Sequence, residues 1–404
     1  MEDNCLIADL HIHSRFSRAC SKNITIHELV KWAKIKGLNL LGTGDFTHPI
    51  WLSEIKELLY EKNGFYYYND FPFILSGEVS LMYTQGTGRR VHLLLLAPSL
   101  DIVEKINLYL DGKGRRDYDG RPIFKISADE FVKSMMGISE DIEIIPAHIW
   151  TPWFGVFGSK SGFNSLRGCF KDQINNIHAI ETGMSSDPPM NWMIKELENK
   201  SIISFSDSHS FWPFRLGREA TIFNKTDSYK GIIKQIRENN FIATIETDPG
   251  YGIYHYDGHR NCNFSCSPEK TKELGGICPV CNQKLTLGVD YRVQELAENP
   301  QGFKIKNSKQ FYKLLPLHEI IALDIGGAIE SKKVWEIYNS LLQDFENEFD
   351  ILLKVSREDF LKKNIDGKLI ALILKNRKGN IKVIPGYDGV YGKPIINEKQ
   401  TTLI

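Results

Sequence analysis

Residues 8–14, near the start of the chain, place a carboxylate and two imidazoles at alternating positions. Because successive side chains of a strand point to opposite faces, Asp9, His11 and His13 would share one face of a strand whose other face is apolar. Burying such a face is costly unless its polar groups are paired, and a divalent metal is the usual partner of mixed imidazole and carboxylate groups. The segment is compatible with a metal-binding strand or with a strand whose polar face is solvated.

Histidine and carboxylate residues also follow several other short apolar segments in residues 1–245. Reactive groups of parallel α/β proteins collect at the carboxyl ends of the strands, where structural histidines have no reason to gather. One such residue is most simply explained as a hydrogen-bonded core or loop residue, but the whole set favours a site. The residues at strand ends are His13, Asp45, Glu78, His148, Glu181, Asp207 and His209, while His92 lies near the start of its strand.

The elements that must position these residues alternate between strands and helices. Near-continuous apolar stretches predict buried strands, and capping-box patterns at residues 25–28 and 127–130 predict helix starts. This alternation is typical of a parallel α/β sheet, open or closed into a barrel. The predicted strands are 4–13, 38–43, 73–78, 91–97, 143–147, 177–181 and 201–207, and the predicted helices are 25–37, 50–62, 101–110, a helix from 127, 189–200 and 227–240.

The composition argues against a protein with an overall basic surface and against a membrane protein. The chain has 404 residues, with 50 basic and 50 acidic residues, so it is not coated in basic surface, although a local basic groove could hold nucleic acid. No apolar run approaches the roughly 20 residues of a membrane span, and the start lacks a signal pattern. We therefore expect a cytoplasmic protein with no membrane partner.

Four of the seven cysteines form two close pairs separated by a loop. This spacing predicts a tetrahedral zinc site, and four thiolate ligands close such a site, making it structural rather than catalytic. An odd number of cysteines without a secretory signal argues against disulfides. The predicted ligands are Cys262, Cys266, Cys278 and Cys281.

A change of character near residue 248 divides the chain into three predicted domains. They are an α/β domain at 1–247, a zinc-ribbon-like module at 248–291 and a small α+β domain at 292–404. In the third domain we predict helices at 308–314, 317–324 and 332–350, and a hairpin of strands 369–375 and 379–385. A glycine-rich loop then carries Tyr387 and Tyr391, which either bind a ligand or pack against a helix.

The order of the histidine and carboxylate motifs resembles that of the polymerase and histidinol phosphatase (PHP) superfamily. The resemblance covers about residues 1–245 and implies a distorted (β/α)7 barrel with two or three divalent metals, such as Zn²⁺, Mg²⁺ or Mn²⁺, at its mouth. The motifs are HIH (11–13), GDFTH (44–48), GE (77–78), VH (91–92), PAH (146–148), IE (180–181) and SDSH (206–209).

The PHP resemblance also implies the distribution of ligands. One metal would be held by His11, His13, Glu78 and Asp207; Glu78 would bridge to a second metal on His92 and His148; and Asp45 or His48 would join His209 at a third. Glu181 is a further implied ligand, Asp9 is not, and Asp207, Glu78 and His148 are the implied catalytic residues. Two positions depart from the pattern of members with three metals, because Phe46 and Ala19 stand where further histidines are common.

Longer strings are similar to the endonuclease Q family over nearly the whole chain. They are residues 42–49, 181–192, 216–220 and 385–392, together with the four-cysteine module. The resemblance implies an endonuclease that uses metal-activated water to cut double- or single-stranded DNA on the 5′ side of deaminated bases (hypoxanthine, uracil, xanthine) and abasic sites. The alternatives are a PHP phosphatase acting on a small phosphomonoester and a catalytically inactive DNA-binding module.

Several aromatic and basic residues suit damaged DNA. Reaching a damaged base requires extruding it, and aromatic side chains can wedge or stack in its place, while arginines hold phosphates. The alternatives are core packing for the aromatic residues and a solvated loop for the basic ones. The candidates are Trp150, Trp153, Phe154, Tyr387 and Tyr391, and Arg115, Arg116 and Arg121.

The last residues, Gln400 to Ile404, match the first half of a sliding-clamp-binding motif. The two aromatic residues that should follow are absent. A sliding clamp is therefore a further candidate partner, with a chance match as the alternative.

Overall fold

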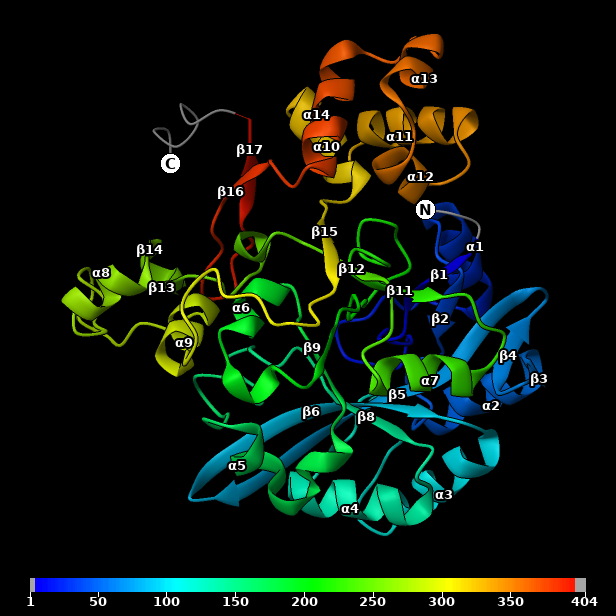
Figure 1. The fold of residues 1–404 in the computed structure, drawn as a ribbon, viewed down its shortest axis with the longest axis vertical. Coiled ribbons are helices and arrows are strands. Elements are labelled where there is room, and N and C mark those ends of the chain that lie inside the picture. Colours follow the sequence, from blue (N-terminus) through cyan, green and yellow to red (C-terminus); the bar gives the residue numbers. More distant parts are fainter. Residues whose placement is uncertain (1–3, 397–404) are drawn as a thin grey trace.

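The computed structural model describes residues 4–396, so the clamp-like segment at 400–404 lies outside the described residues. Its centre is a mixed sheet to which eleven strands of the described chain contribute (Figure 1). Strand β2 pairs in parallel with β1 on one side and with β5 on the other, whereas β1 pairs antiparallel with β11. The first elements are β1 (Cys5–Asp9), α1 (Ile26–Lys36), β2 (Leu40–Gly42), α2 (Pro49–Leu58), β3 (Tyr60–Lys62), β4 (Phe65–Tyr68), β5 (Phe71–Gln85), β6 (Thr87–Ala97) and α3 (Leu100–Asp111).

The prediction of a parallel sheet is therefore wrong for part of the fold. Strands β5 and β6 are much longer than predicted and pair antiparallel from Leu75 to Ala97, and β6 pairs antiparallel with β8. A tight turn at Gly86, whose φ is 72°, joins β5 to β6, and such a hairpin needs no crossover helix. The following elements are β7 (Ile123–Phe124), α4 (Ala128–Ile138), β8 (Glu143–Pro146), α5 (Leu166–Phe170), β9 (Ala179–Glu181), α6 (Pro188–Trp192), β10 (Ser201–Ile203), β11 (Ala220–Asn224), α7 (Tyr229–Arg237) and β12 (Ala243–Glu246).

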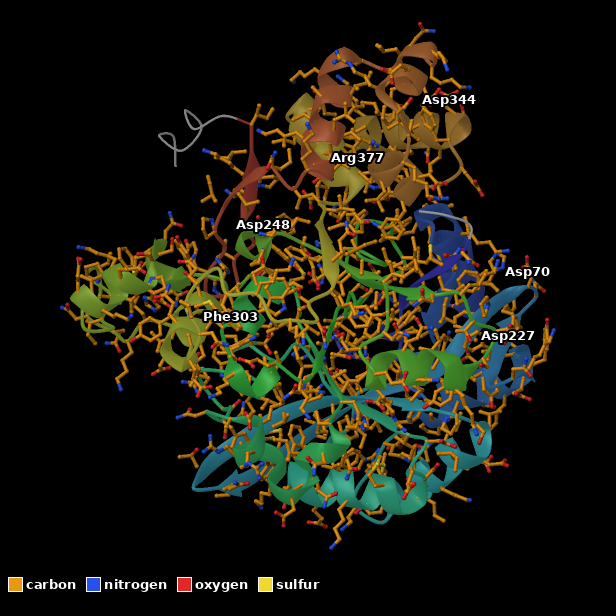
Figure 2. The ribbon with its side chains drawn as sticks, viewed as in Figure 1. Asp70, Asp227, Asp248, Phe303, Asp344 and Arg377 are labelled. Carbon is orange, nitrogen blue, oxygen red and sulfur yellow. The ribbon has the colours of Figure 1, made fainter. Side chains whose placement is uncertain are left out.

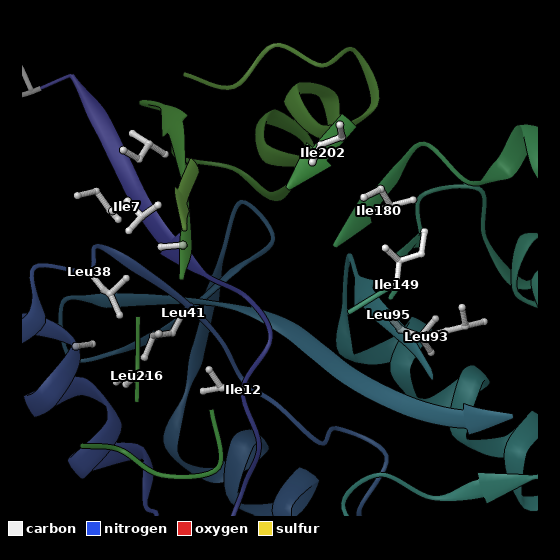
Figure 3. Close-up of a cluster of buried hydrophobic side chains, with 14 of the residues drawn as sticks. Ile7, Ile12, Leu38, Leu41, Leu93, Leu95, Ile149, Ile180, Ile202 and Leu216 are labelled. Atoms are coloured by element: carbon white, nitrogen blue, oxygen red, sulfur yellow. The ribbon is translucent and has the colours of Figure 1, made fainter. Parts of the chain in front are cut away.

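The core lies between the strands and their covering helices. Apolar residues of β1, β2 and β6 share one buried cluster with Ile149, which follows β8, and with Ile180 of β9 (Figure 3). Each fully buried aliphatic side chain contributes about 1.5–3 kcal/mol to stability, which fixes the short strands that carry the site. By contrast, Asp70 and Asp227 are exposed at the surface (Figure 2).

Two C-terminal predictions are wrong. Residues 308–314 do not form a helix; they contain β15, which extends the main sheet by pairing in parallel with β12, so tertiary pairing overrides the local pattern. Residues 369–375 belong to helix α14, whose N-cap Asp366 accepts from the backbone N–H groups of Lys368 and Leu369. An apolar run of this length does not by itself distinguish a strand from a buried helix.

Most of the remaining elements form two small hairpins and a cluster of helices. The predicted helix 332–350 is split in two, and Asn347 caps the second part. None of the helices in residues 4–396 is long and apolar enough to cross a membrane. The elements are β13 (Asp257–His259), β14 (Phe264–Cys266), α8 (Pro268–Glu273), α9 (Val289–Leu296), β15 (Gln310–Lys313), α10 (Leu317–Ile325), α11 (Lys332–Asp344), α12 (Glu348–Leu353), α13 (Arg357–Lys362), α14 (Gly367–Arg377), β16 (Lys382–Ile384) and β17 (Lys393–Ile395), with short 3-10 turns at Lys171–Asn176, Lys195–Leu197, Pro249–Tyr251 and Arg260–Cys262.

A buried ion pair joins the helical cluster to the N-terminal region. Lys36 at the end of α1 donates through Nζ to Glu348 Oε1 at 2.7 Å, and both side chains are buried. Glu348 also accepts from the backbone N–H of Leu317 and the hydroxyl of Tyr338. Nearby, the buried ring of His318 packs against α11 at 4.0 Å from the ring of Tyr338. This interface fixes α10–α12 against α1.

Candidate metal-dependent active site

The first and last histidine motifs of the predicted site meet directly after β1. Ile12 forms a parallel bridge with Ser208, and the backbone N–H of His13 donates to the carbonyl of Ser208 at 2.9 Å. Asp9 lies just below, where it accepts from the backbone N–H groups of Ser206 and Gly217. Asp9 therefore anchors the segment that carries Asp207 and, as expected, stays outside the candidate ligands.

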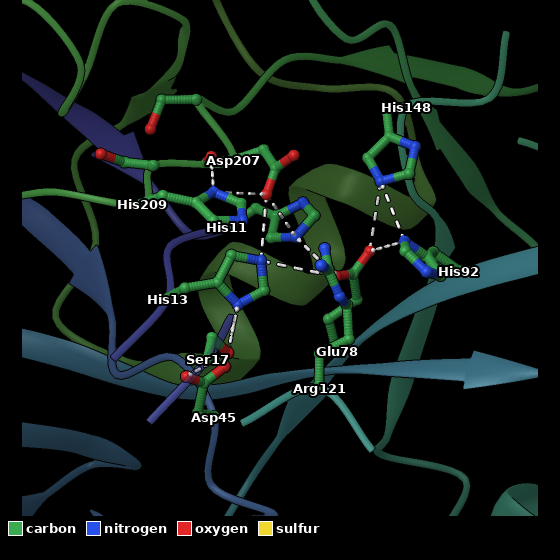
Figure 4. A network of polar contacts seen from close by, with 12 residues as sticks. His11, His13, Ser17, Asp45, Glu78, His92, Arg121, His148, Asp207 and His209 are labelled. Carbon is green, nitrogen blue, oxygen red and sulfur yellow. Dashed lines mark hydrogen bonds and ion pairs between the residues drawn. The ribbon is translucent and has the colours of Figure 1, made fainter. Parts of the chain in front are cut away.

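Four of the predicted ligands converge in one group (Figure 4). Asp207 Oδ1 lies 3.0 Å from His13 Nε2 and 3.7 Å from His11 Nε2. Glu78 Oε2 lies 3.4 Å from His13 Nε2 and 3.7 Å from His11 Nε2. This is the set that the PHP resemblance assigned to one metal.

A second group shares Glu78 with the first. Its other oxygen, Oε1, lies 2.9 Å from His92 Nδ1 and 3.3 Å from His148 Nε2. The two imidazole nitrogens are themselves 3.3 Å apart. Glu78 therefore presents one carboxylate oxygen to each group, as a bridging ligand would (Figure 4).

The donor atoms fit divalent metals. His11 Nε2 is buried, and no hydrogen-bond partner reaches it among the described residues. An orphaned imidazole nitrogen beside two carboxylates is a costly arrangement that a metal ion would satisfy. Mixed imidazole and carboxylate donors suit Zn²⁺ or Mn²⁺ better than Ca²⁺.

Glu181 and Asp45, both predicted as ligands, instead hold the histidines. Glu181 accepts from His11 Nδ1 at 2.9 Å and from the backbone N–H of His148 at 2.8 Å. Asp45 accepts from His13 Nδ1 at 2.9 Å and from the backbone N–H of Ser14 at 2.6 Å. In both pairs the carboxylate holds Nδ1 and leaves Nε2 directed at the ligand group, as supporting carboxylates do in metal sites.

The residues predicted for a third metal do not join a group of three or more candidate ligands among residues 4–396. Neither ligand group contains His48 or His209. The ring of His48 stacks on Phe16 at 4.2 Å between centroids. His209 lies beside the first group, with its ring centroid 4.6 Å from that of His13, and its Nδ1 bonds the backbone carbonyl of Asp207.

The electrostatics of the site keep the carboxylates ionised. Burial raises the pKa of Glu78, but His92, Arg121 and His11 outweigh it and hold the pKa well below its ordinary value. Burial likewise opposes charge on His11, yet Glu181 and Glu78 raise the pKa of its imidazole. The pocket therefore concentrates negative charge around the imidazole nitrogens, which favours a cation.

Three residues of the site adopt the left-handed backbone region. The φ angles are 45° at Asp45, 30° at His148 and 48° at Asp207. Non-glycine residues rarely adopt such angles, and strain of this kind concentrates at functional sites. Each residue lies just after an apolar β segment, where the sharp turn directs its side chain toward the site.

The aromatic candidates for DNA contact separate into two kinds. Trp150 is only 1% exposed and donates through Nε1 to Asn191 at 2.8 Å, so it belongs to the core, and its predicted role as a wedge is wrong. Trp153 is 36% exposed and packs its edge against Tyr254. Phe154 covers His92, with ring centroids 4.2 Å apart, and so forms one wall of the metal site.

The basic candidates also differ in their surroundings. Arg121 points into the site, with Nη1 3.2 Å from Glu78 Oε2, instead of extending from the surface toward a phosphate. Arg115 is exposed and pairs with Asp117, while Arg116 pairs with Asp111. Of these three arginines, Arg121 alone reaches the ligand groups.

The two predicted tyrosines lie on the C-terminal turn. Tyr387 donates to Asn263 Oδ1 at 2.8 Å, which joins the turn to the cysteine module. Tyr391 is 40% exposed, and its ring lies 5.2 Å from the guanidinium carbon of Arg215.

The structure changes one ligand of the predicted cysteine site. Cys262, Cys278 and Cys281 group with His259, and its Nδ1 lies 3.2 Å from Cys262 Sγ and 3.3 Å from Cys281 Sγ. Cys266 instead contacts the hydroxyl of Thr271 at 3.2 Å. The sequence held a signal for His259, because its two-residue separation from Cys262 repeats that of Cys278 and Cys281.

The chain is similar in sequence to known proteins. The model of the MJ0043 C-terminal domain family matches residues 316–380. The Methanocaldococcus jannaschii protein MJ0043 is 32% identical over 69% of this chain, and the chain spans about a third of that protein's length, 34%.

Two solved structures match almost the whole chain. The lesion-specific endonuclease PfuEndoQ from Pyrococcus furiosus is 31% identical, with a TM-score of 0.87 over 99% of this chain and 97% of that one. Endonuclease Q in complex with a 27-mer duplex bearing an abasic lesion at the active site is 32% identical, with a TM-score of 0.88 over 98% of this chain and 97% of that one.

The mixed α/β fold and its two adjoining ligand groups define a candidate metal-dependent enzyme. At this identity and coverage, the chain belongs to the endonuclease Q family.

Proposed function

We propose that the protein is a metal-dependent DNA repair endonuclease with a PHP-type barrel. It would cut the phosphodiester on the 5′ side of deaminated bases and abasic sites. The observation that carries this proposal is the pair of ligand groups joined by Glu78. The solved relative that holds an abasic duplex at its active site supports DNA as the substrate. Such an enzyme works with DNA inside the cell.

The residues of the chain divide the work of this reaction. When bound, the metals would supply an activated water and neutralise phosphoryl oxygens. Glu78 would help to hold both metals, one together with His11, His13 and Asp207 and the other together with His92 and His148. Phe154 would exclude water from the side of His92.

The cysteine module would hold a structural zinc ion and position the C-terminal turn. Burial raises the pKa of Cys278, but backbone N–H groups of Val280 and Cys281 outweigh it and lower the pKa to about 7. A thiolate favoured near neutral pH suits a zinc ligand. The contact of Tyr387 with Asn263 would transmit the order of the module to the turn.

The test is cleavage of duplexes that carry a single hypoxanthine, uracil, abasic site or normal base, with and without Mg²⁺ or Mn²⁺. We expect nicks only at lesions and only with metal. Asp207→Asn should lower the nicking rate at least about 100-fold. Losing a residue that only supports a metal ligand costs about 10- to 100-fold, and a ligand itself should cost at least as much. Its matched control, Asp227→Asn, changes an exposed aspartate and should nick normally.

Two outcomes would contradict the proposal. Release of phosphate from small phosphomonoesters without any nick would favour a phosphatase. Binding of lesion duplexes without cleavage under every metal would favour a DNA-binding module.

A further inference from the structure

Two arginines lie in the loop between β10 and β11, close to the metal site but outside both ligand groups. Arg218 donates through Nη2 to the backbone carbonyl of Ser206 at 3.2 Å, directly before Asp207 in the chain. Its Nε and Nη1 are buried and have no hydrogen-bond partner among the described residues. A buried guanidinium with unused donors is costly, and an anion that accepts from them would remove that cost.

The guanidinium carbon of Arg215 lies 5.2 Å from the ring centroid of Tyr391. Within residues 4–396, neither Arg215 nor Arg218 forms an ion pair, whereas Arg121, Arg237 and Arg292 each contact a carboxylate. The two arginines therefore place positive charge beside the candidate active site without a direct carboxylate partner among the described residues.

The acidic groups nearest to these arginines have other partners. Glu319 accepts from the hydroxyl of Tyr251, and burial raises the pKa of this carboxyl. Glu219 accepts from the backbone N–H and the hydroxyl of Thr247, and burial raises its pKa to about 7. Asp207 contributes to the first ligand group. Asp207 and Glu219 favour the charge of Arg218 from a distance, but among the described residues no carboxylate forms an ion pair with it.

The C-terminal turn places Tyr391 against both arginines. Gly386 donates to the carbonyl of Gly250 at 2.8 Å, and Gly392 donates to that of Tyr251 at 3.0 Å. A Cβ at Gly392 would lie 2.1 Å from the carbonyl oxygen of Gly250, so this approach requires glycine. Burial opposes ionisation of Tyr391, but Arg218 and Arg215 outweigh it and lower the pKa of the phenol.

We propose that Arg215, Arg218 and Tyr391 form a subsite for a DNA phosphate next to the phosphodiester that is cut. The inference rests on the proposed function and adds a determinant that none of the predicted ligands supplies. Guanidinium groups match phosphate oxygens in geometry and charge, and the tyrosine hydroxyl adds a donor at the exposed edge. Because Arg218 is held by the segment that carries Asp207, the bound strand would be placed relative to the metals.

The first test measures binding of an abasic duplex by fluorescence anisotropy, using the full-length Asp207→Asn variant so that DNA is not cut. Adding Arg218→Gln should weaken binding about 10- to 100-fold, the cost of a charged hydrogen bond, and should lower the slope of log affinity against log salt by about one. Tyr391→Phe should weaken it less, because the ring remains. The control Arg357→Gln changes an exposed arginine on α13 and should alter neither quantity.

The second test replaces single phosphates around the abasic site with neutral methylphosphonates. At one position next to the cut bond, the replacement should weaken binding by the parent protein but leave binding by the Arg218→Gln variant unchanged. Independent effects at every position would overturn the subsite. The subsite would also be overturned if inorganic phosphate bound at Arg218 without competing with the duplex.

The experiments distinguish failure of the phosphate subsite from failure of the endonuclease function. If the wild-type protein nicks lesions but Arg218→Gln binds like Arg357→Gln, the subsite is wrong and the function stands. If the wild-type protein never nicks but Arg218→Gln loses affinity and salt dependence, the arginine binds a DNA phosphate and the proposed cleavage function is wrong. Arg218→Lys, which keeps the charge, should recover part of the affinity, and unchanged thermal unfolding of the variants shows that they fold.

Discussion

Each of three histidines in the candidate site has one ring nitrogen engaged and the other directed at a ligand group. Glu181 holds His11 and Asp45 holds His13, and the hydroxyl of Thr151 lies 2.9 Å from Nδ1 of His148. Such partners fix the tautomer and the orientation of a metal-binding imidazole. At the residue scale, the site therefore depends on groups that would never touch a metal.

Glu181→Gln tests this dependence. The change keeps the size of the side chain but removes the charge that orients His11, so we expect metal affinity or nicking to fall about 10- to 100-fold. Metal affinity measured by calorimetry separates this effect from loss of DNA binding. Glu143→Gln is a matched control, since Glu143 holds His178 at 3.1 Å outside both ligand groups. Equal losses in both variants would argue against the orienting role.

The residues that converge in the two ligand groups were largely predictable from the sequence, whereas the contacts of each side chain were not. Alternation along one strand placed His11 and His13 together, and the order of motifs supplied the other members of both groups. The sequence does not show whether a carboxylate binds a metal or accepts a hydrogen bond from Nδ1 of a histidine. Glu181 and Asp45 were therefore predicted as ligands, although each contacts a histidine Nδ1. Trp150 was misassigned for a similar reason, because sequence position does not report burial.

At the scale of elements, short buried strands and the early helices were predictable from apolar runs and caps. The long β5–β6 hairpin was not, because its outer half is exposed and lacks a continuous apolar run. Strand β15 escaped prediction because its partner β12 lies far away in the sequence. Pairing between distant segments decides such elements, and local propensity does not record it.

The cysteine module allows a direct comparison between two candidate ligands. We expect His259→Gln to lower zinc affinity at least about tenfold, because the structure places this imidazole with three thiols. Cys266→Ser, the matched control, should retain zinc, because Cys266 contacts Thr271 instead. Zinc content after purification and titration with a chelator measure both. Loss of zinc from Cys266→Ser alone would restore the four-cysteine site.

At the scale of the whole molecule, the packing between α1 and the C-terminal helices determines how the protein responds to acid. Burial, reinforced by Lys36, lowers the pKa of His318 from 6.5 to about 3. The folded protein therefore excludes a proton that the unfolded chain accepts below pH 6.5. The free energy of unfolding therefore decreases through this residue as pH falls from about 6.5 toward 3.

His318→Phe should remove this sensitivity. Between pH 6.5 and pH 5 the wild-type protein should lose about 1.7 kcal/mol of unfolding free energy through this residue. The slope rises from about 0.7 kcal/mol per pH unit at pH 6.5, where the unfolded histidine is half protonated, toward about 1.4 kcal/mol per pH unit. The phenylalanine ring suits the aromatic surroundings and does not titrate. Urea unfolding at the two pH values measures the difference. An identical pH dependence in the variant would show that other groups cause any acid sensitivity.

The bridge between Ile12 and Ser208 bears on the order in which the protein folds. His13 and Asp207 are 194 positions apart, so the first ligand group cannot close until most of the strands have assembled. Contacts over such distances form late, after the slow closure of long loops. Metal ions should therefore leave the refolding rate nearly unchanged and mainly slow unfolding, which stopped-flow measurements with and without Mn²⁺ can check. During synthesis, the first ligand group could therefore bind a metal only after Asp207 has left the ribosome, when about half of the chain has been made.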